Sequence, residues 1–295
     1  MEYAAATAAR KGSAMSDDRE IIGFLHPGAM GVSLAATARN TGHAVYWSSA
    51  GRSEQSRARA ARHGVVDAGS LEALCRICGI IVCVCPPHAA VEVAEQVQAS
   101  GFRGIYADVN AISPQKAKHI GQLMSTAGAD FVDGGIIGLP AWKPDTTWLY
   151  LSGQSAERVA ACFDAGPLGV EVIGDDVGKA SALKMCFAAN TKGTTALLCA
   201  ILAAAEQLGV RRELEAQWSR NGSDQARKTR ERVRGVTAKA WRFSGEMEEI
   251  ASTLDAAGLP AGFHLAAREV YERLSGFEEA GELPALEEVL ATLIA

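Results

Sequence analysis

The sequence predicts an α/β fold of the Rossmann type, with a doubly wound parallel sheet, followed by an all-α domain. Short apolar segments alternate with helical patterns from about residue 20 to residue 175. Segments that are apolar on both faces are typical of a parallel sheet covered by helices on two sides. A helical pattern then runs from 177 to 209, and only helical patterns follow. We expect an NADP-binding Rossmann domain at 19–175 and a helical substrate and dimerisation domain at 176–295.

The turn residues divide the first domain into elements. Glycine ends most of the helical patterns, as it commonly does, and the helix that begins after Ser113 has this residue as N-cap and Pro114 in its first position. Strands are predicted, in order, at 20–25, 44–49, 79–85, 104–110, 129–137, 146–152 and 170–175. Helices are predicted at 29–42, 53–64, 71–78, 87–101, 113–128 and 155–166.

Composition limits the class of protein and its partners. The 295 residues are enough for two domains. The net charge is −5, from 29 Lys and Arg against 34 Asp and Glu, so no basic surface is expected for nucleic acid or an anionic membrane. A small molecule is the expected partner, with no nucleic acid and no membrane. Residues 1–18 have low hydrophobicity and no periodicity, which predicts a disordered tail.

The N-terminus and the cysteines favour a cytoplasmic protein. The first residues lack the apolar segment of a secretory signal, and no stretch approaches the ~20 uncharged apolar residues of a membrane span. Most of the seven cysteines lie in apolar segments, which suits a reducing compartment. Cys75 and Cys78 form a C-x-x-C pair, and Cys83 and Cys85 form a C-x-C pair. The first pair has no histidine nearby and the second lies in a predicted strand, so we predict no metal.

The segment IIGFLHPGAMG, residues 21–31, predicts a dinucleotide site. An apolar strand leads through a glycine turn into a helix, whose unpaired N–H groups and partial positive charge bind pyrophosphate. The G-x-G-x-x-G spacing falls on His26, Gly28 and Gly31, so two of three glycines match. The alternative is a plain strand-to-helix turn. Pro27 has no N–H, so phosphate binding is expected at the amides from Gly28 onward. The residues expected to contact the cofactor here are His26, Pro27, Gly28, Ala29, Met30 and Gly31.

The end of the second predicted strand favours NADP(H) over NAD(H). An acid at this place would bind the ribose 2′-hydroxyl, but the sequence has Ser48 there and no carboxylate before Glu54. Hydroxyls and a guanidinium suit a 2′-phosphate instead. The alternative is an ordinary solvated loop. The candidate 2′-phosphate ligands are Ser48, Ser49, Arg52 and Ser53.

These motifs resemble those of the β-hydroxyacid dehydrogenase and 6-phosphogluconate dehydrogenase superfamily. Gly23, Phe24, Gly28, Met30 and Gly31 fit its opening G-F-I-G-x-G-x-M-G. The chain is more similar still to a little-characterised branch with a phosphogluconate-dehydrogenase NAD-binding domain and a distinct helical domain. That branch has L-H-P-G-x-M-G, C-P-P-H, F-V-D-G-G-I-I-G, A-L-K-M and G-E-M-E-E-I. The resemblance covers residues 20 to 277 and implies an oxidoreductase.

The resemblance implies that Lys184, in GKASALKMCF, is the catalytic lysine. Burial in an apolar cleft lowers a lysine pKa, and such a lysine can pass a proton to or from a carbonyl oxygen during hydride transfer. Leu183, Met185 and Phe187 predict that the surrounding segment is buried. Lys192 follows eight residues later, about 80° round an α-helix, and is expected near the same cleft.

Three family positions differ and predict a changed substrate. Ala188 replaces an asparagine, Ile137 replaces the serine of a substrate loop, and Glu248 replaces a lysine. The glycines of DGGIIG still permit close backbone approach, and Glu249 and His264 are candidate acid–base or amine-binding groups. The expected substrate-binding residues are Gly134, Gly135, Ile137, Gly138, Lys192, Glu249 and His264. Beside the nicotinamide ribose the resemblance places Cys85, Pro86, Pro87 and Asn110.

The function expected from this sequence is an NADP-dependent oxidoreductase that acts on a small carbonyl or hydroxy compound, with Lys184 as general acid or base. One alternative is an imine reductase or reductive aminase, for which Glu248 and Glu249 would favour a cationic amine. Imine reductases generally lack a lysine at the position of Lys184, so the presence of this lysine favours alcohol chemistry. Another alternative is an NADP-binding protein without turnover. The oligomeric state that the resemblance implies and the apolar helix at 194–209 together predict a homodimer.

Overall fold

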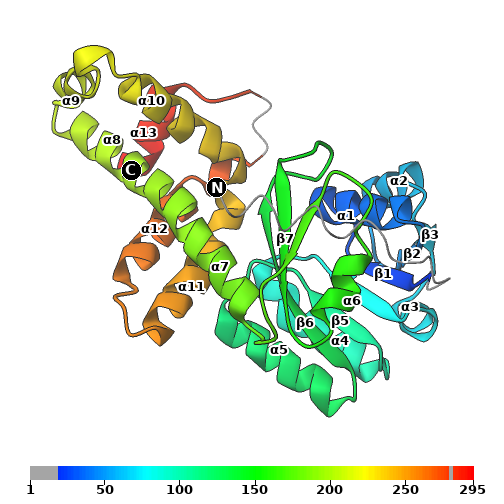
Figure 1. The fold of residues 1–295 in the computed structure, drawn as a ribbon. Helices are drawn as coiled ribbons and strands as arrows, with labels where there is room; N and C mark the ends of the chain where they lie inside the picture. Colours follow the sequence, from blue (N-terminus) through cyan, green and yellow to red (C-terminus); the bar gives the residue numbers. More distant parts are fainter. Residues whose placement is uncertain (1–18, 279–281) are drawn as a thin grey trace.

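The structure is a computed structural model that describes residues 19–278 and 282–295. The predicted tail at 1–18 lies outside these residues. In the described chain one sheet has the strand order β3-β2-β1-β4-β5-β6-β7-β8, with helices on both of its faces and a further group of helices beside it (Figure 1). The strands are β1 Ile21–Leu25, β2 Ala44–Trp47, β3 Val66–Asp67, β4 Ile80–Cys83, β5 Ile105–Asp108, β6 Asp130–Gly138, β7 Thr147–Ser152 and β8 Gly169–Val172.

The sheet is parallel from β3 to β6, as predicted, but β7 pairs antiparallel with β6, and β8 runs parallel to β7. The reason is the short connection at 139–146, because a parallel return would need a crossover of a dozen or more residues. The strand β3 was not predicted, since its two residues are exposed and too few to form a pattern.

Helices cover both faces of the sheet because alternate strand residues point to opposite sides. Ile22 and Phe24 of β1 belong to the core under α1, α2 and α6, whereas Leu25 belongs to the core under α3, α4 and α5. Both cores are buried, which explains why the strands are apolar throughout. These helices are α1 Ala29–Asn40, α2 Glu54–Arg62, α3 Leu71–Ile77, α4 Ala90–Ala99, α5 Pro114–Thr126 and α6 Ala156–Ala161.

From Lys179 onward the described chain is helical and has its own core, which includes Met185, Cys199, Met247 and Tyr271. The long helix predicted at 177–209 forms, but its middle, Ala189–Gly193, is π-helical. The α-helices are α7 Lys179–Ala188, α8 Thr194–Gln207, α9 Arg211–Trp218, α10 Gln225–Val236, α11 Ala240–Ala256, α12 Gly262–Arg273 and α13 Leu286–Ile294. The 3₁₀ turns are η1 Pro87–Ala89, η3 Arg220–Gly222, η4 Thr237–Lys239 and η5 Ser275–Phe277.

The continuous stretch Lys179–Gln207 is long and apolar enough, by length and composition alone, to cross a membrane. Within its most apolar 18-residue window, 39% of the residues are buried inside the structure. Core helices of soluble proteins meet the same test, and Met185, Cys199 and Leu202 of this stretch are in the helical core.

Candidate functional site

The turn after β1 leads directly into the N-terminus of α1, as the glycine motif predicts. Gly28 is the N-cap, no side chain caps the helix, and its first turn has no acidic residue. A side chain at Gly31 would collide with the carbonyl oxygen of His26, so the close approach of turn and helix requires glycine there. The Gly28 amide, expected to bind phosphate, donates instead to the His26 carbonyl at 2.8 Å. The N–H groups available to an anion are therefore those of Ala29, Met30 and Gly31.

His26 takes the place of the first glycine and contacts the Arg52 guanidinium through its ring Nε2. Burial, and secondarily the charge of Arg52, lower the pKa of His26 to about 4. The imidazole is thus neutral at physiological pH and can accept a hydrogen bond from the guanidinium. Arg59 of α2 donates to the Pro27 carbonyl at 3.3 Å, so a second guanidinium lies against the same turn.

The four residues expected at a 2′-phosphate lie in different places. Ser48 and Arg52 line a cavity of about 430 Å³ together with His26, Glu72 and Gln96. Ser53 is instead the N-cap of α2 and accepts from the Ser56 amide at 3.3 Å.

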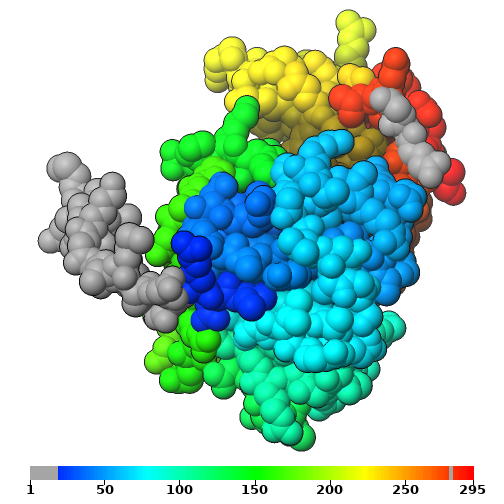
Figure 2. Space-filling model, turned by 90° about the vertical axis from the view of Figure 1, so that its right-hand side faces the viewer, coloured from blue at the N-terminus to red at the C-terminus, as the bar shows by residue number. Residues whose placement is uncertain are grey.

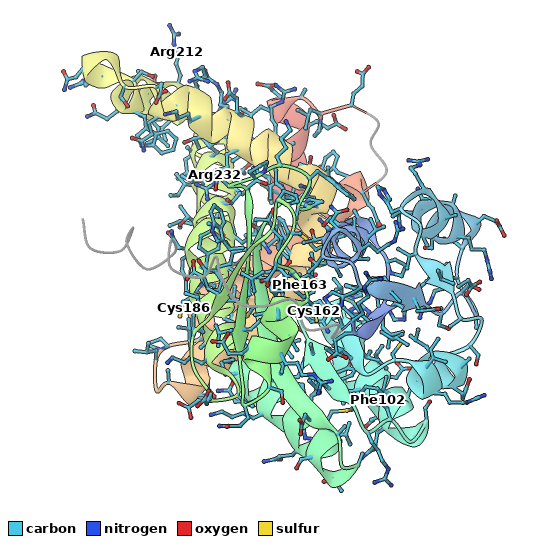
Figure 3. All side chains as sticks on the ribbon, turned by 45° about the vertical axis from the view of Figure 1, so that its right-hand side comes forward. Phe102, Cys162, Phe163, Cys186, Arg212 and Arg232 are labelled. Carbon is cyan, nitrogen blue, oxygen red and sulfur yellow. The ribbon has the colours of Figure 1, made fainter. Side chains whose placement is uncertain are left out.

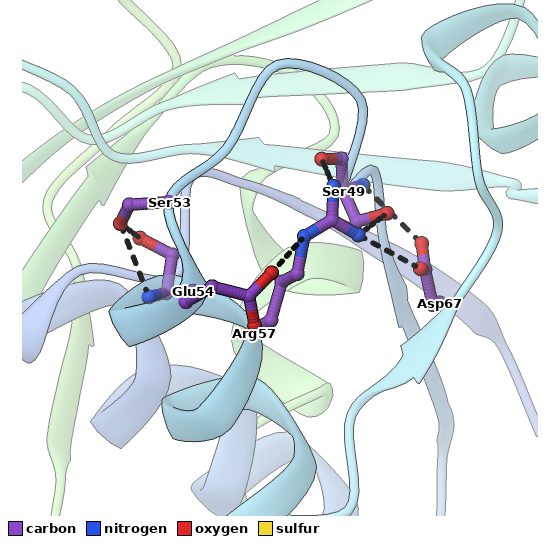
Figure 4. Close-up of polar contacts among 6 residues, drawn as sticks. Ser49, Ser53, Glu54, Arg57 and Asp67 are labelled. Atoms are coloured by element: carbon purple, nitrogen blue, oxygen red, sulfur yellow. Dashed lines mark hydrogen bonds and ion pairs between the residues drawn. The ribbon is translucent and has the colours of Figure 1, made fainter.

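Ser49 is engaged in a separate network (Figure 4). Its Oγ accepts from Arg57 at 2.7 Å, and its amide donates to Asp67 at 3.2 Å. Sequence reasoning missed Arg57 and Asp67. Asp67 ends the unpredicted strand β3, so nothing in the sequence pattern indicated that it would reach this loop.

The ends of β4 and β5 are joined by Asn110, which is 3% exposed. Its Oδ1 accepts from the Cys85 amide at 2.5 Å, and its Nδ2 donates to Asp108 at 3.0 Å. Burial raises the pKa of Asp108 to about 7. Asn110 therefore holds in place the chain that leads to Pro86 and Pro87, where η1 packs against α11. Its side-chain amide is occupied by these bonds.

Lys184 lies on α7 directly against β6. A Cβ added to Gly135 would be 2.9 Å from both the Lys184 Cβ and the Ala180 oxygen, so glycine lets this helix lie on the strand. Burial, followed by the charge of Lys192, lowers the pKa of Lys184 to about 8, while Glu246 acts in the opposite direction. The segment is less buried than predicted, because Leu183 and Phe187 are exposed.

Lys192 lies in the π-helical segment and forms an ion pair with Glu246 of α11. Both side chains are mostly buried, at 18% and 13% exposed. The ammonium also lies 4.4 Å from the centre of the Phe243 ring. A π-turn rotates less per residue than an α-turn, so the angle of about 80° expected between Lys184 and Lys192 is reduced. Sequence reasoning missed Glu246 and Phe243, since only the fold brings α11 to α7.

Two buried carboxylates join the sheet to the helical part. Asp133 of β6 accepts from the amides of Gly178 and Ser181, each at 3.0 Å, at the N-terminus of α7. Glu249 of α11 accepts from the Ser113 amide at 2.8 Å at the N-terminus of α5, and it also pairs with Lys116. Each part of the molecule thus supplies the acid that caps a helix of the other. Glu249, expected in the substrate site, has its carboxylate engaged here.

The other predicted substrate residues are dispersed. Gly134 and Ile137 lie within the β6–β7 ladder, opposite Leu151 and Trp148, rather than in a loop. Gly138, with φ of 131°, ends that strand at the hairpin. His264 is buried behind the π-helical segment, and a Cβ added to Gly193 would be 2.9 Å from its Nε2. The structure therefore brings Gly135, Lys184 and Lys192 together, and neither Glu249 nor His264 is in the ion pair beside them.

Comparisons with known proteins agree with this architecture. The NAD binding domain of 6-phosphogluconate dehydrogenase matches residues 21–164, and a domain of unknown function, DUF1932, matches residues 205–274. Lys184 and Lys192 lie between the two matches. An uncharacterised 28.5 kDa protein of Methanothermus fervidus is 33% identical over 164 residues, which are 56% of this chain and 62% of that protein.

Solved structures share the whole fold. A conserved protein of unknown function, described as similar to 3-hydroxyacid dehydrogenases, is 28% identical with a TM-score of 0.65, over 93% of this chain and 100% of its own. The 3-hydroxyisobutyrate dehydrogenase of Mycobacterium tuberculosis is 18% identical with a TM-score of 0.66, over 94% and 100%. An imine reductase from Myxococcus stipitatus is 18% identical with a TM-score of 0.54, over 94% and 100%.

Residues 21–164 therefore match the NAD-binding domain of 6-phosphogluconate dehydrogenase and residues 205–274 match a DUF1932 domain, on a fold shared with a protein described as similar to 3-hydroxyacid dehydrogenases.

Proposed function

We propose that this protein is an NADP-dependent oxidoreductase that acts on a small carbonyl or hydroxy compound. The observation on which this rests is Lys184, a partly buried amine with a pKa of about 8, on a helix that Gly135 allows to pack closely against β6. A group that titrates near the working pH is suited to general acid–base catalysis. Bound NADP(H) supplies or accepts the hydride. Lys184 as ammonium donates a proton to the carbonyl oxygen in reduction, and as amine it accepts the hydroxyl proton in oxidation.

Residues of the first turn support cofactor binding. The uncapped start of α1 offers the amides of Ala29, Met30 and Gly31 to a pyrophosphate. Preference for NADP(H) over NAD(H) is supported by Arg52, which neutral His26 holds at the cavity that Ser48 lines. A guanidinium is suited to bidentate binding of a phosphate.

The test separates cofactor binding from chemistry. NADPH and NADH are titrated first, and then a panel of carbonyls, imines and hydroxy acids is assayed with wild type and Lys184→Met. Lys179→Met is the matched control, since Lys179 is exposed on the same helix. We expect turnover to be lost only in Lys184→Met. Undiminished turnover in that variant would remove Lys184 from the mechanism, and tighter binding of NADH would overturn the proposed role of Arg52.

The imine alternative is less well supported, because the two acids that would favour a cationic amine are engaged elsewhere. Glu248 pairs with Arg268 at 2.7 Å on the surface, and Glu249 pairs with Lys116. Turnover of the imines alone in the same panel would favour this alternative. Tight cofactor binding without turnover of any substrate would favour a non-catalytic role.

We further propose that the protein is a homodimer. Leu183, Phe187 and Leu197 of the long helix are 37%, 44% and 43% exposed, and apolar side chains gathered on one helix indicate an association surface. Analytical ultracentrifugation at micromolar concentration tests this. A monodisperse monomer would contradict it.

A further inference from the structure

A second cavity lies at the end of the helical part formed by α9, α10 and α13. Its volume is about 750 Å³, larger than the cavity beside Arg52. In the space-filling view the α9–α10 region, in yellow, projects beyond the strand-bearing part (Figure 2). Nothing in the proposed redox chemistry uses this groove. Five of its lining residues are the arginines Arg211, Arg212, Arg227, Arg230 and Arg234.

The groove has more positive charge than its own acids neutralise. Three glutamates, Glu215, Glu231 and Glu287, line it with the five arginines. Residues 211–234 contain eight Lys and Arg against four Asp and Glu, in a chain whose net charge is −5. A basic groove in an acidic protein is not explained by general solubility, because charge elsewhere has the opposite sign.

The ion pairs identify which arginines are available. Arg211 binds Glu206 at 2.7 Å and Glu287 at 3.2 Å. Arg227 binds Glu231 at 2.8 Å, and Arg230 binds Glu215 at 2.6 Å.

Arg234 donates only to the carbonyl oxygens of Pro284 and Leu283, at 2.7 and 3.3 Å. Arg212 extends away from the outer end of the helical part (Figure 3). Within residues 19–278 and 282–295 neither of these two guanidiniums has a carboxylate partner. The pKa of the Glu287 carboxyl is nevertheless lowered by its own backbone N–H, then by Arg211, and also by the charge of Arg234, so Arg212 is the guanidinium without a charged partner among the described residues. A guanidinium outside an ion pair is suited to phosphate or carboxylate.

Two further groups at the groove lack partners. The Oε1 atom of Glu215 is buried without a hydrogen bond among the described residues, since Arg230 takes the other oxygen. A hydroxyl or a protonated phosphate would supply the missing donor. The nine-residue helix α13 begins at this wall, and no side chain caps its N-terminus. Its first N–H groups are donors at this wall, beside the carboxylates of Glu287 and Glu288 in the same turn.

We propose that this groove binds a small multivalent anion, with phosphate or carboxylate groups held by Arg212 and Arg234. The site is separate from the cofactor loop and from Lys184, so the proposal stands independently of the redox function. Inorganic pyrophosphate and citrate are the probes, and calorimetric titration of each distinguishes phosphate from carboxylate as the preferred group. Saturation with NADPH beforehand keeps the probes from the pyrophosphate site of α1.

Three variants with the same loss of charge test the assignment. Arg212→Gln and Arg234→Gln should each weaken binding about tenfold, the effect of losing one charge-assisted hydrogen bond. Arg220→Gln, which alters an exposed arginine of η3 that does not line the groove, should leave binding unchanged. Arg212 makes no bond within the described residues, so its variant should unfold at the wild-type temperature. The proposal is overturned if wild type binds neither probe, or if Arg220→Gln weakens binding as much as Arg212→Gln.

Discussion

The two members of the Lys192–Glu246 ion pair should shift the pKa of Lys184 in opposite directions. The charge of Lys192 lowers the pKa of Lys184, and the charge of Glu246 raises it. Lys192→Met removes the repelling ammonium and leaves a carboxylate beside Lys184, so the pKa should rise. Glu246→Gln leaves two ammonium groups with no acid between them, so the pKa should fall below about 8.

The size of each effect follows from the total shift. The drop from 10.5 to about 8 corresponds to about 3.4 kcal/mol of differential interaction. Burial is the largest cause, so the ion pair accounts for less than half of this energy. We therefore expect each variant to move the pKa of Lys184 by about one pH unit, or about 1.4 kcal/mol.

Two measurements check the signs. In carbonyl reduction the acid form of Lys184 is active, so kcat/KM falls as pH rises through its pKa. The falling limb should move to higher pH in Lys192→Met and to lower pH in Glu246→Gln. Carbon NMR of labelled lysines, with Lys184→Met to assign the resonance, reports the same pKa without a substrate. Shifts in the same direction in both variants, or none in either, would refute the reasoning.

Three further predictions concern the joint between the two parts, the cofactor turn and a buried acid. Glu249→Gln leaves Lys116 without its carboxylate and should cost about 3 kcal/mol in urea unfolding, whereas Glu248→Gln, at an exposed pair, should cost under about 1 kcal/mol. Equal losses of unfolding free energy in the two variants would contradict the role of Glu249 in joining the sheet to the helical part. Gly31→Ala should weaken cofactor binding at least tenfold because its Cβ meets the His26 carbonyl, whereas Gly28→Ala, whose Cβ meets nothing within 4 Å, should keep the wild-type fold; cofactor titration and thermal unfolding of both variants decide. The folded-state pKa of Asp108 is about 7, above the ordinary 3.8, so the folded state binds the extra proton and loses stability as pH rises from about 4 to 7. In urea unfolding, the stability of Asp108→Asn relative to wild type should increase as the pH rises across that range. A difference in unfolding free energy that does not change with pH would contradict this prediction.

The cofactor turn could be predicted from the sequence because its determinants are local. A buried strand, a glycine immediately before a helix and a glycine inside its first turn are neighbours in the chain. Gly31 and Arg52 lie where the pattern indicates. Ser49 and Ser53 could not be separated from Ser48, since a hydroxyl serves equally as a ligand, as a helix cap or as the partner of an arginine.

The lysine site could be predicted only in part because its partners come from distant segments. Lys184 has a recognisable neighbourhood, but Glu246 joins it only when α11 packs against α7. Glu249 is close to Glu246 in sequence, yet it caps α5 on the other side of the joint. Residues three apart on a helix share a face only approximately. The packing of α11, which the sequence does not display, decides that Glu246 lies beside the lysines and that Glu249 joins the two parts of the molecule.

The π-helical segment has a consequence for how relatives of this chain diverge. Such a turn contains one residue more than the α-turn it replaces. Loss of a single residue from 189–193 would let α7 and α8 merge into one regular helix. If the lost residue preceded Lys192, the two lysines would be seven residues apart on a regular α-helix, and their directions would differ by about 20°. The π-helical segment therefore accommodates its extra residue without the rotation of about 80° that eight regular α-helical residues would place between the two amines.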